Sequence, residues 1–182
     1  MRIVAGEYKG RKIKAPLDDR VRPTTGKVKE AMFSMLSNDI PGAFVVDLFS
    51  GTGNLGLEAL SRGARKCCFV DNSQSSLKLI EENINTLGAN DRAVVIRGHY
   101  LKGIMSLSEK DDVILMDPPY NKDIPEKAIE AVLEHDVLSE DGVILVEHYY
   151  REKLNESYGR LKLDRERSYG TIVLSVFRYN SL

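Results

Sequence analysis

Tryptophan is absent from this sequence of 182 residues, and cysteine and histidine are scarce, with two and three residues. The two cysteines, Cys67 and Cys68, are adjacent, and adjacent side chains on a strand point to opposite faces of its sheet. We therefore expect no disulfide framework. We also expect no metal site, because no spacing of cysteine or histidine supports one.

Long apolar runs are missing as well. None approaches the roughly 20 residues that a membrane-spanning helix needs. The opening MRIVAGEYKGRKIK lacks the apolar core of a signal peptide. With 42% hydrophobic and 29% charged residues, the composition is that of an ordinary globular domain, and the length suits one domain. We expect a cytoplasmic protein with no membrane association.

No charge sign dominates overall, since the net charge is −1, but the charges are unevenly distributed. Residues 1–30 hold nine Lys/Arg and four Asp/Glu, whereas residues 31–150 hold ten basic and nineteen acidic residues. A basic arm on an acidic body indicates a polyanionic partner. The alternative is that solvated lysines only keep an edge strand soluble, and the charges alone favour neither interpretation.

Apolar runs alternate with amphipathic segments along the chain, which predicts a parallel sheet covered by helices on both faces. We expect one domain, in which residues 1–25 form a small β-appendage and residues 26–182 form the α/β core. The core should end in two antiparallel strands around Tyr169-Gly170. The strands expected in the core are 43–49, 67–71, 93–98, 112–117 and, after an Asp141-Gly142 turn, 143–148. The helices expected are one within 22–37, one ending near Gly63, 73–87 with Ser73 as its cap and Gly88 as its stop, and 125–135.

A glycine-rich turn joins the first core strand to a helix. In VVDLFSGTGNLGLEAL, Gly51, Gly53 and Gly56 form a complete G-x-G-x-x-G. This pattern predicts a close approach of the backbone to a ligand and helix N–H groups that face an anion. Asp71 follows 18 residues after Gly53, at the end of the next strand, where it suits ribose hydroxyls. Alone, the pattern also fits a nicotinamide dehydrogenase, or a turn that uses glycine for geometry only.

Asp47 indicates which kind of nucleoside cofactor the turn binds. It ends the first strand just ahead of the turn, where a carboxylate would repel a pyrophosphate and attract a positively charged group. S-adenosyl-L-methionine carries an amino group and a sulfonium, together with a carboxylate for the helix N-terminus. The turn therefore predicts methyl transfer.

A stiff corner, DPPY, ends the fourth core strand with the residues Asp117, Pro118, Pro119 and Tyr120. Neither proline can donate a hydrogen bond, so the Asp117 carboxylate and the Pro118 carbonyl make an acceptor-only rim, and Tyr120 offers a stacking face. Two acceptors on the N–H bonds of a nucleobase amine would favour a pyramidal nitrogen and aim its lone pair at a methyl sulfonium. The alternative is a turn with an incidental acid and tyrosine.

Together, DLFSGTGNLGLEAL, FVDNS and MDPPY resemble the class I S-adenosylmethionine-dependent methyltransferases of exocyclic amino groups. The opening RIVAGEYKGRKI, the segment RPTTGKVKEAMFSML and the late SYGT are similar to one bacterial family within that class. This family, the RsmD type, methylates the N2 amine of one guanine in 16S ribosomal RNA. The resemblance covers essentially the whole chain and implies a Rossmann-like class I methyltransferase fold.

The resemblance also implies roles for individual residues. The cofactor would be held by Asp47, Ser50, Gly51, Thr52, Gly53, Asp71, Asn72 and His99, and the guanine by Asp117, Pro118, Pro119 and Tyr120. His99 stands where such enzymes often place an acid for the adenine amine, and it can accept that bond only as a neutral imidazole. From the charge distribution, and not from the resemblance, we expect RNA to be bound by Arg2, Lys9, Arg11, Lys12, Lys14 and Arg22.

The partner implied is 16S ribosomal RNA in the small ribosomal subunit or its assembly intermediate, bound by a monomer. Three alternatives stay open at this point. A DNA adenine-N6 methyltransferase and a protein glutamine-N5 methyltransferase both use a related corner. A non-catalytic RNA-binding assembly factor could keep the same fold, although the intact acids and glycine turn argue against it.

Overall fold

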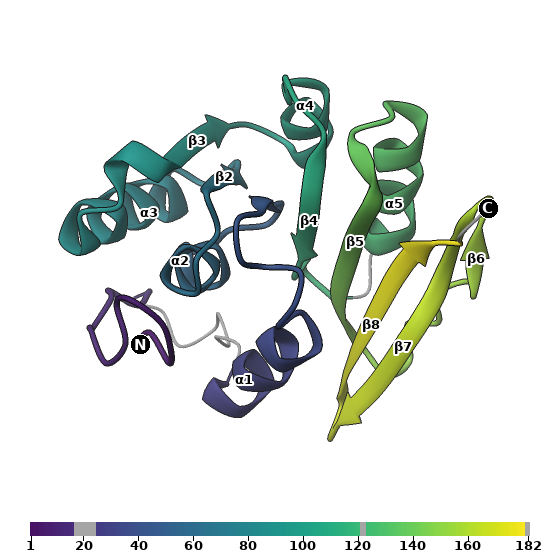
Figure 1. Ribbon diagram of the computed structural model, residues 1–182, viewed down its shortest axis with the longest axis horizontal. Coiled ribbons are helices and arrows are strands. Elements are labelled where there is room, and N and C mark those ends of the chain that lie inside the picture. The colour runs from purple at the N-terminus through teal and green to yellow at the C-terminus, as the bar shows by residue number, and fades with distance from the viewer. Residues whose placement is uncertain (17–24, 121–122, 181–182) are drawn as a thin grey trace.

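A mixed sheet runs through the middle of the molecule (Figure 1). The computed structural model describes residues 1–16, 25–120 and 123–180. Among these residues the strands are β1 (Phe44–Asp47), β2 (Lys66–Asp71), β3 (Ala93–Arg97), β4 (Asp111–Met116), β5 (Leu138–Tyr149), β6 (Ser157–Tyr158), β7 (Leu161–Tyr169) and β8 (Ile172–Tyr179). The helices are α1 (Gly26–Met35), α2 (Asn54–Ser61), α3 (Gln74–Leu87), α4 (Tyr100–Met105) and α5 (Ile124–Glu134), with a 3₁₀ turn, η1 (Asn90–Arg92).

The strand order is β3-β2-β1-β4-β5-β8-β7-β6. The first five strands in this order are parallel, and β8 joins β5 in antiparallel register and continues into the β7–β8 hairpin. The order reverses between β1 and β4, which is the switch point where open α/β sheets bind ligands. The expected α/β class, with a mostly parallel sheet and a C-terminal antiparallel hairpin, is confirmed.

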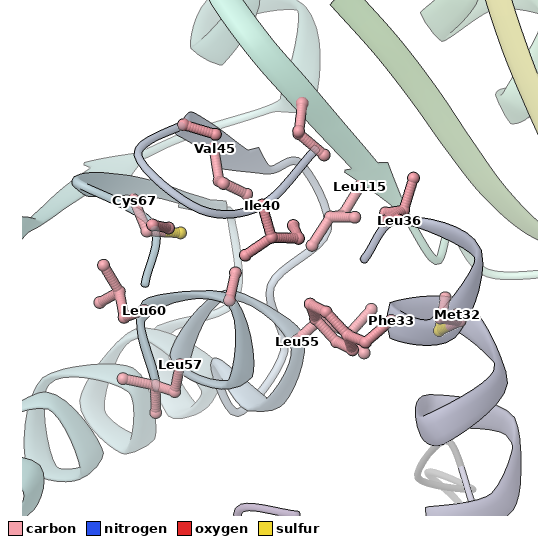
Figure 2. Packing of buried hydrophobic residues seen from close by; sticks show 14 of the residues in the cluster. Met32, Phe33, Leu36, Ile40, Val45, Leu55, Leu57, Leu60, Cys67 and Leu115 are labelled. Atoms are coloured by element: carbon pink, nitrogen blue, oxygen red, sulfur yellow. The ribbon is translucent and has the colours of Figure 1, made fainter. Parts of the chain in front are cut away.

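Alternating side chains send one set of apolar residues to each face of the sheet. Val45 packs on the face covered by α1, α2 and α3, whereas Val46 packs on the face covered by α4 and α5. Cys67 and Cys68 divide in the same way, as expected, and both are buried free thiols. Figure 2 shows the first face, where α1 and α2 side chains meet β1, β2 and β4 in one buried cluster.

Two details differ from the sequence-based expectation. Asp141-Gly142 does not precede the strand as a turn but lies within β5, which begins at Leu138, at a shift in register against β4. Helix α4 was not expected after β3. Its Gly103 packs against Val70, where an added Cβ would lie 2.5 Å from a methyl carbon. This glycine is therefore a close-packing residue within a helix.

The N-terminal segment, residues 1–16, docks on α2, and its two ends pair through backbone bonds from Ile3 to Arg11 and from Ile13 to Met1. It contains a single antiparallel bridge, Arg2 to Lys12. Its backbone N–H groups bond a side chain of the core, since Glu58 accepts from Val4 (2.9 Å) and Ala5 (3.0 Å). Gly6, at φ +83°, lies so close that a Cβ would meet the Ser61 carbonyl oxygen at 1.8 Å. The expected β-appendage is thus a tightly packed loop.

A buried ion pair fixes this segment to the helix that follows the glycine turn. Lys29 Nζ lies 3.0 Å from Glu58 Oε2 and donates to the Arg2 carbonyl (2.8 Å) and Asn54 Oδ1 (2.8 Å). Burial lowers the pKa of Lys29, an effect that Glu58 opposes. Removing one member would leave the other charged and buried, which costs about 3–5 kcal/mol.

Candidate active site

Three carboxylates meet at the carboxyl edge of the parallel strands. Asp47 ends β1, Asp71 ends β2, and Asp117 directly follows β4. In the pairing of β1 with β4, Asp47 is opposite Leu115, so Asp117 lies only two residues beyond the partner of Asp47. The sheet therefore brings the residue predicted for the cofactor and the residue predicted for the target amine to neighbouring positions.

The glycine turn has the backbone geometry that its sequence predicts. Gly51 and Gly53 take φ values of +55° and +80°, which favour glycine, and Gly53 is the N-cap of α2. Gly56 lies against β2, because a Cβ there would come within 2.3 Å of the Phe69 ring. Ser50 closes the turn by donating its hydroxyl to the Asp47 carbonyl oxygen at 2.6 Å.

Asp47 is fully buried beneath this turn. Its Oδ2 accepts from the Gly56 N–H at 2.9 Å. Within the part of the chain that the structure describes, Oδ1 has no hydrogen-bond partner. Burial raises the pKa of Asp47 to about 7; the Gly56 N–H lowers it and the nearby Asp71 raises it further. A buried carboxylate oxygen without a partner is stabilised by a nearby cation, so Asp47 fits the amino or sulfonium group of S-adenosylmethionine.

Asp71 connects the end of β2 to two loops. Its Oδ2 accepts from the Gly51 N–H and its Oδ1 from the Ser73 N–H, both at 2.8 Å. Each carboxylate oxygen keeps a further lone pair, so these bonds leave room for ribose hydroxyls. The neighbouring Asn72 is exposed, whereas Thr52 in the glycine turn is buried. The acid thus holds the turn in place whether or not it also contacts a ligand.

His99 begins α4 at the end of β3. Its Nδ1 accepts from the Leu101 N–H at 3.4 Å, which makes it the N-cap of that helix. The imidazole also lies 4.2 Å from the ring of Tyr100. A neutral imidazole has only one acceptor nitrogen, so the Leu101 N–H and an adenine amine would compete for Nδ1 of His99.

The DPPY corner lies beside a buried acid that the sequence analysis missed. Pro118 is buried, whereas Pro119 and Tyr120 are exposed. The Tyr120 hydroxyl donates to Glu147 Oε1 at 3.1 Å, and Glu147 is 3% exposed on β5. An acid inside the apolar run VILVEH was the available signal, because charged residues are rarely buried without a partner. Glu147 therefore holds the ring of Tyr120.

The basic residues of the N-terminal segment fall into two groups. Arg11 donates to the carbonyl oxygens of Thr86 and Leu87 at the end of α3, and Lys14 pairs with Glu82 at 2.8 Å. The remaining three, all exposed, are Arg2, which donates to the Gly10 carbonyl, Lys9 and Lys12. Arg22 lies outside the described residues. RNA binding by these residues stays a prediction.

Among residues 1–16, 25–120 and 123–180, no group of three or more His, Cys, Asp or Glu side chains lies close enough to hold a metal ion. Over the same residues, every helix is too short or too polar to cross a membrane.

Known proteins resemble the chain over nearly its whole length. A family model described as "Conserved hypothetical protein 95" matches residues 1–178. Ribosomal RNA small subunit methyltransferase D of Escherichia coli is 28% identical over 178 residues, which cover 98% of this chain and 89% of that protein. The Haemophilus influenzae protein of the same name is 33% identical over 150 residues, which cover 81% of this chain and 78% of that protein.

A solved structure agrees with these sequence matches. The structure described as "Putative methyltransferase yhhF from Escherichia coli" superposes with a TM-score of 0.89 at 27% identity, covering 100% of this chain and 99% of that one. The resemblance found in the sequence motifs is confirmed. The chain belongs to the family of Conserved hypothetical protein 95, which it shares with the ribosomal RNA small subunit methyltransferase D proteins.

Proposed function

We propose that this protein transfers a methyl group from S-adenosylmethionine to the exocyclic N2 amine of one guanine in 16S ribosomal RNA. The observation that carries the proposal is the pairing of β1 with β4. It brings the buried carboxylate Asp47 next to β4, the strand that is directly followed by Asp117 and the rest of the DPPY corner. A site for a cation and a site for an amine are thus adjacent on one edge of the sheet.

The residues present fit the cofactor, which supplies an electrophilic methyl group when it is bound. Asp47 would hold its positively charged end, and Asp71 would accept from the ribose hydroxyls. Gly51 and Gly53 let the backbone approach the ligand without a side chain in the way. The cofactor contacts of Ser50, Thr52, Asn72 and His99 belong to the same proposal.

The target amine would bind at the DPPY corner. The Asp117 carboxylate and the Pro118 carbonyl would accept its two N–H bonds, so that the nitrogen lone pair would point toward the methyl group to be transferred. Tyr120, held by Glu147, stacks on the guanine ring. Bonding of the nitrogen to the methyl carbon would break that carbon's bond to sulfur and release S-adenosylhomocysteine, and the nitrogen would lose one proton, which we assign to Asp117. Positioning and electrostatics account for most of this chemistry.

The substrate class follows from the relatives and from the charge distribution. The relatives carry names of ribosomal RNA small subunit methyltransferases. The exposed Lys9 and Lys12 give the N-terminal segment positive charge for phosphate groups. We propose the small subunit or its assembly intermediate as substrate, since the chain has one small domain with which to select a single guanine by shape.

Methyl transfer to isolated small subunits would test the proposal. Subunits from a strain that lacks the gene are incubated with radiolabelled S-adenosylmethionine and the protein, and the RNA is digested to nucleosides. We expect label in N2-methylguanosine of 16S RNA. Label in N6-methyladenosine, or in glutamine of a ribosomal protein, would overturn the guanine assignment. The absence of label in every fraction would favour a non-catalytic assembly factor.

A further inference from the structure

An aromatic surface extends from the DPPY corner along the end of the neighbouring strand. Tyr120 lies 6.1 Å from Tyr149, and Tyr149 lies 4.6 Å from Tyr150, measured between ring centroids. Both distances fall within the range of about 4.5–7 Å typical of interacting aromatic pairs. Because β4 and β5 are parallel neighbours with Met116 opposite Val146, the corner and the end of β5 share one edge of the sheet.

Tyr120 and Tyr150, the outer two residues of this aromatic surface, are open to solvent. Tyr120 is 37% exposed and Tyr150 46% exposed, which makes them two of the five large apolar or aromatic side chains that are exposed among the described residues. Tyr149, between them, is half-buried and acts as a spacer. Tyr150 is fixed in place because its N–H donates to the Thr171 carbonyl oxygen on the β7–β8 hairpin at 2.9 Å.

A positive charge accompanies the last ring. The guanidinium of Arg151 lies 5.4 Å from the Tyr150 ring centroid, and its Nε donates to the Tyr150 hydroxyl at 2.8 Å. Lys153 follows two residues later and is exposed. Glu152, the acid between them, accepts from the Tyr149 N–H at 3.0 Å. An exposed ring with a guanidinium over it fits a nucleobase and its phosphate.

We propose that Tyr150 and Arg151 form a binding site for the unpaired nucleotide adjacent to the target guanine, with Tyr150 stacking on its base and Arg151 contacting its phosphate. This inference rests on the proposed function. A guanine whose N2 amine enters the DPPY corner must leave its base pair and its stack, and its neighbour then loses a stacking partner. A tyrosine face returns about 1–3 kcal/mol per base.

A double-mutant cycle between protein and RNA tests this site directly. The probe is an RNA hairpin whose loop holds a guanine with one unpaired neighbour; a second hairpin carries an abasic site at that neighbour. Wild type should bind the first hairpin about 5- to 150-fold more tightly, the fold-change that matches stacking of one base. Tyr150→Ala should bind both hairpins equally, whereas Tyr150→Phe should discriminate as wild type does. Met105→Ala, at an exposed apolar residue beyond the other end of β4, is the matched control.

The salt dependence of binding separates the two members of the site. Arg151→Gln should reduce the slope of log affinity against log salt by about 0.7, the value of one phosphate contact on single-stranded RNA, and Tyr150→Ala should leave the slope unchanged. Equal binding of the two hairpins by wild type, or equal loss in Tyr150→Phe and Tyr150→Ala, would overturn the stacking site. Methyl transfer to guanine N2 without an interaction between Tyr150 and the unpaired base would overturn the stacking site but not the proposed function. That interaction without methyl transfer to guanine N2 would overturn the proposed function but not the stacking site.

Discussion

Asn83, on α3, donates its side-chain amide to the carbonyl oxygen of Thr52 in the glycine turn at 3.0 Å. The same side chain bonds the backbone of Lys14 in both directions, accepting at 2.7 Å and donating at 3.1 Å. Asn83 is fully buried, so these bonds have no competition from solvent. One amide therefore connects the N-terminal segment with the turn that is expected to hold the cofactor.

Replacing Asn83 should affect stability and cofactor binding together. Asn83→Ala leaves the Thr52 carbonyl and the Lys14 backbone without their partner, and we expect a loss of about 1–3 kcal/mol in the free energy of unfolding. S-adenosylmethionine affinity should fall as well, because the glycine turn loses a fixed point. Urea denaturation and calorimetry measure the two effects. Asn85→Ala, at an exposed position of the same helix, should change neither.

Cofactor affinity should depend on pH through Asp47. Its pKa of about 7 means that protonation competes with a cationic ligand below that pH. We expect wild-type affinity to fall by up to tenfold per pH unit below about 7 and to level off above it. Asp47→Asn should bind weakly at every pH between 5.5 and 8.5 in calorimetry. A wild-type profile without slope in this range would contradict the assignment; Asp91→Asn, at an exposed acid, is the control.

Asp117 and Glu147 should influence turnover by different routes. Asp117→Ala removes an acceptor for the target amine, so single-turnover methyl transfer should be lost while S-adenosylhomocysteine affinity stays near that of wild type. Glu147→Gln keeps an acceptor for the Tyr120 hydroxyl and should retain much of the activity, whereas Glu147→Ala should lose activity as Tyr120→Ala does. Near-normal transfer by Asp117→Ala would show that the amine binds elsewhere.

Asp111, at the start of β4, should make stability depend on pH. Burial raises its pKa to about 8, and the acids Asp112 and Glu109 raise it further. Since the folded protein holds a proton that the unfolded chain releases near pH 4, the free energy of unfolding should decrease as pH rises from about 4 to about 8. Asp111→Asn should remove this part of the decrease in urea denaturation at pH 5, 7 and 9. Asp141→Asn, at an exposed acid, should leave it unchanged.

Lys9 and Lys12 offer the cleanest test of RNA binding by the N-terminal segment. Substituting Arg11 or Lys14 would also disturb their contacts with α3, so it would not isolate an effect on RNA. The double substitution Lys9→Ala and Lys12→Ala should flatten the salt dependence of RNA binding by about 0.7–0.9 per lost contact, with cofactor affinity unchanged. The pair Lys110→Ala and Lys127→Ala on the acidic body is the control. Equal slopes for wild type and both variants would mean that these lysines only aid solubility.

The sequence was sufficient wherever structure is determined locally. Asp47 and Asp117 could be assigned to one edge because they end apolar strands of a parallel sheet. Ser73 and Gly88 bound α3 as expected, because caps follow residue chemistry. The glycine turn was recognisable because its positive φ angles require that residue type.

What the sequence did not predict depends on contacts between distant segments. Glu147 and Tyr150 lie near the DPPY corner because of the register of β5 with β4 and β8, which residue patterns do not specify. Helix α4 is short, and its Gly103 is explained only by close packing on Val70. The N-terminal segment was expected as β-structure, yet its N–H groups bond Glu58, 53 or 54 residues away.

These long-range bonds set an order of events during synthesis. The N-terminal segment leaves the ribosome first, but its partners come later: Glu58 and Ser61 on α2, Asn83 on α3, and Arg92, which donates to Tyr8 and Glu7 at 2.7 and 2.8 Å. Until residue 92 has emerged, Ile3, Tyr8 and Ile13 have no complete core to enter. Residues 1–16 thus cannot complete these contacts until the chain through Arg92 has been translated.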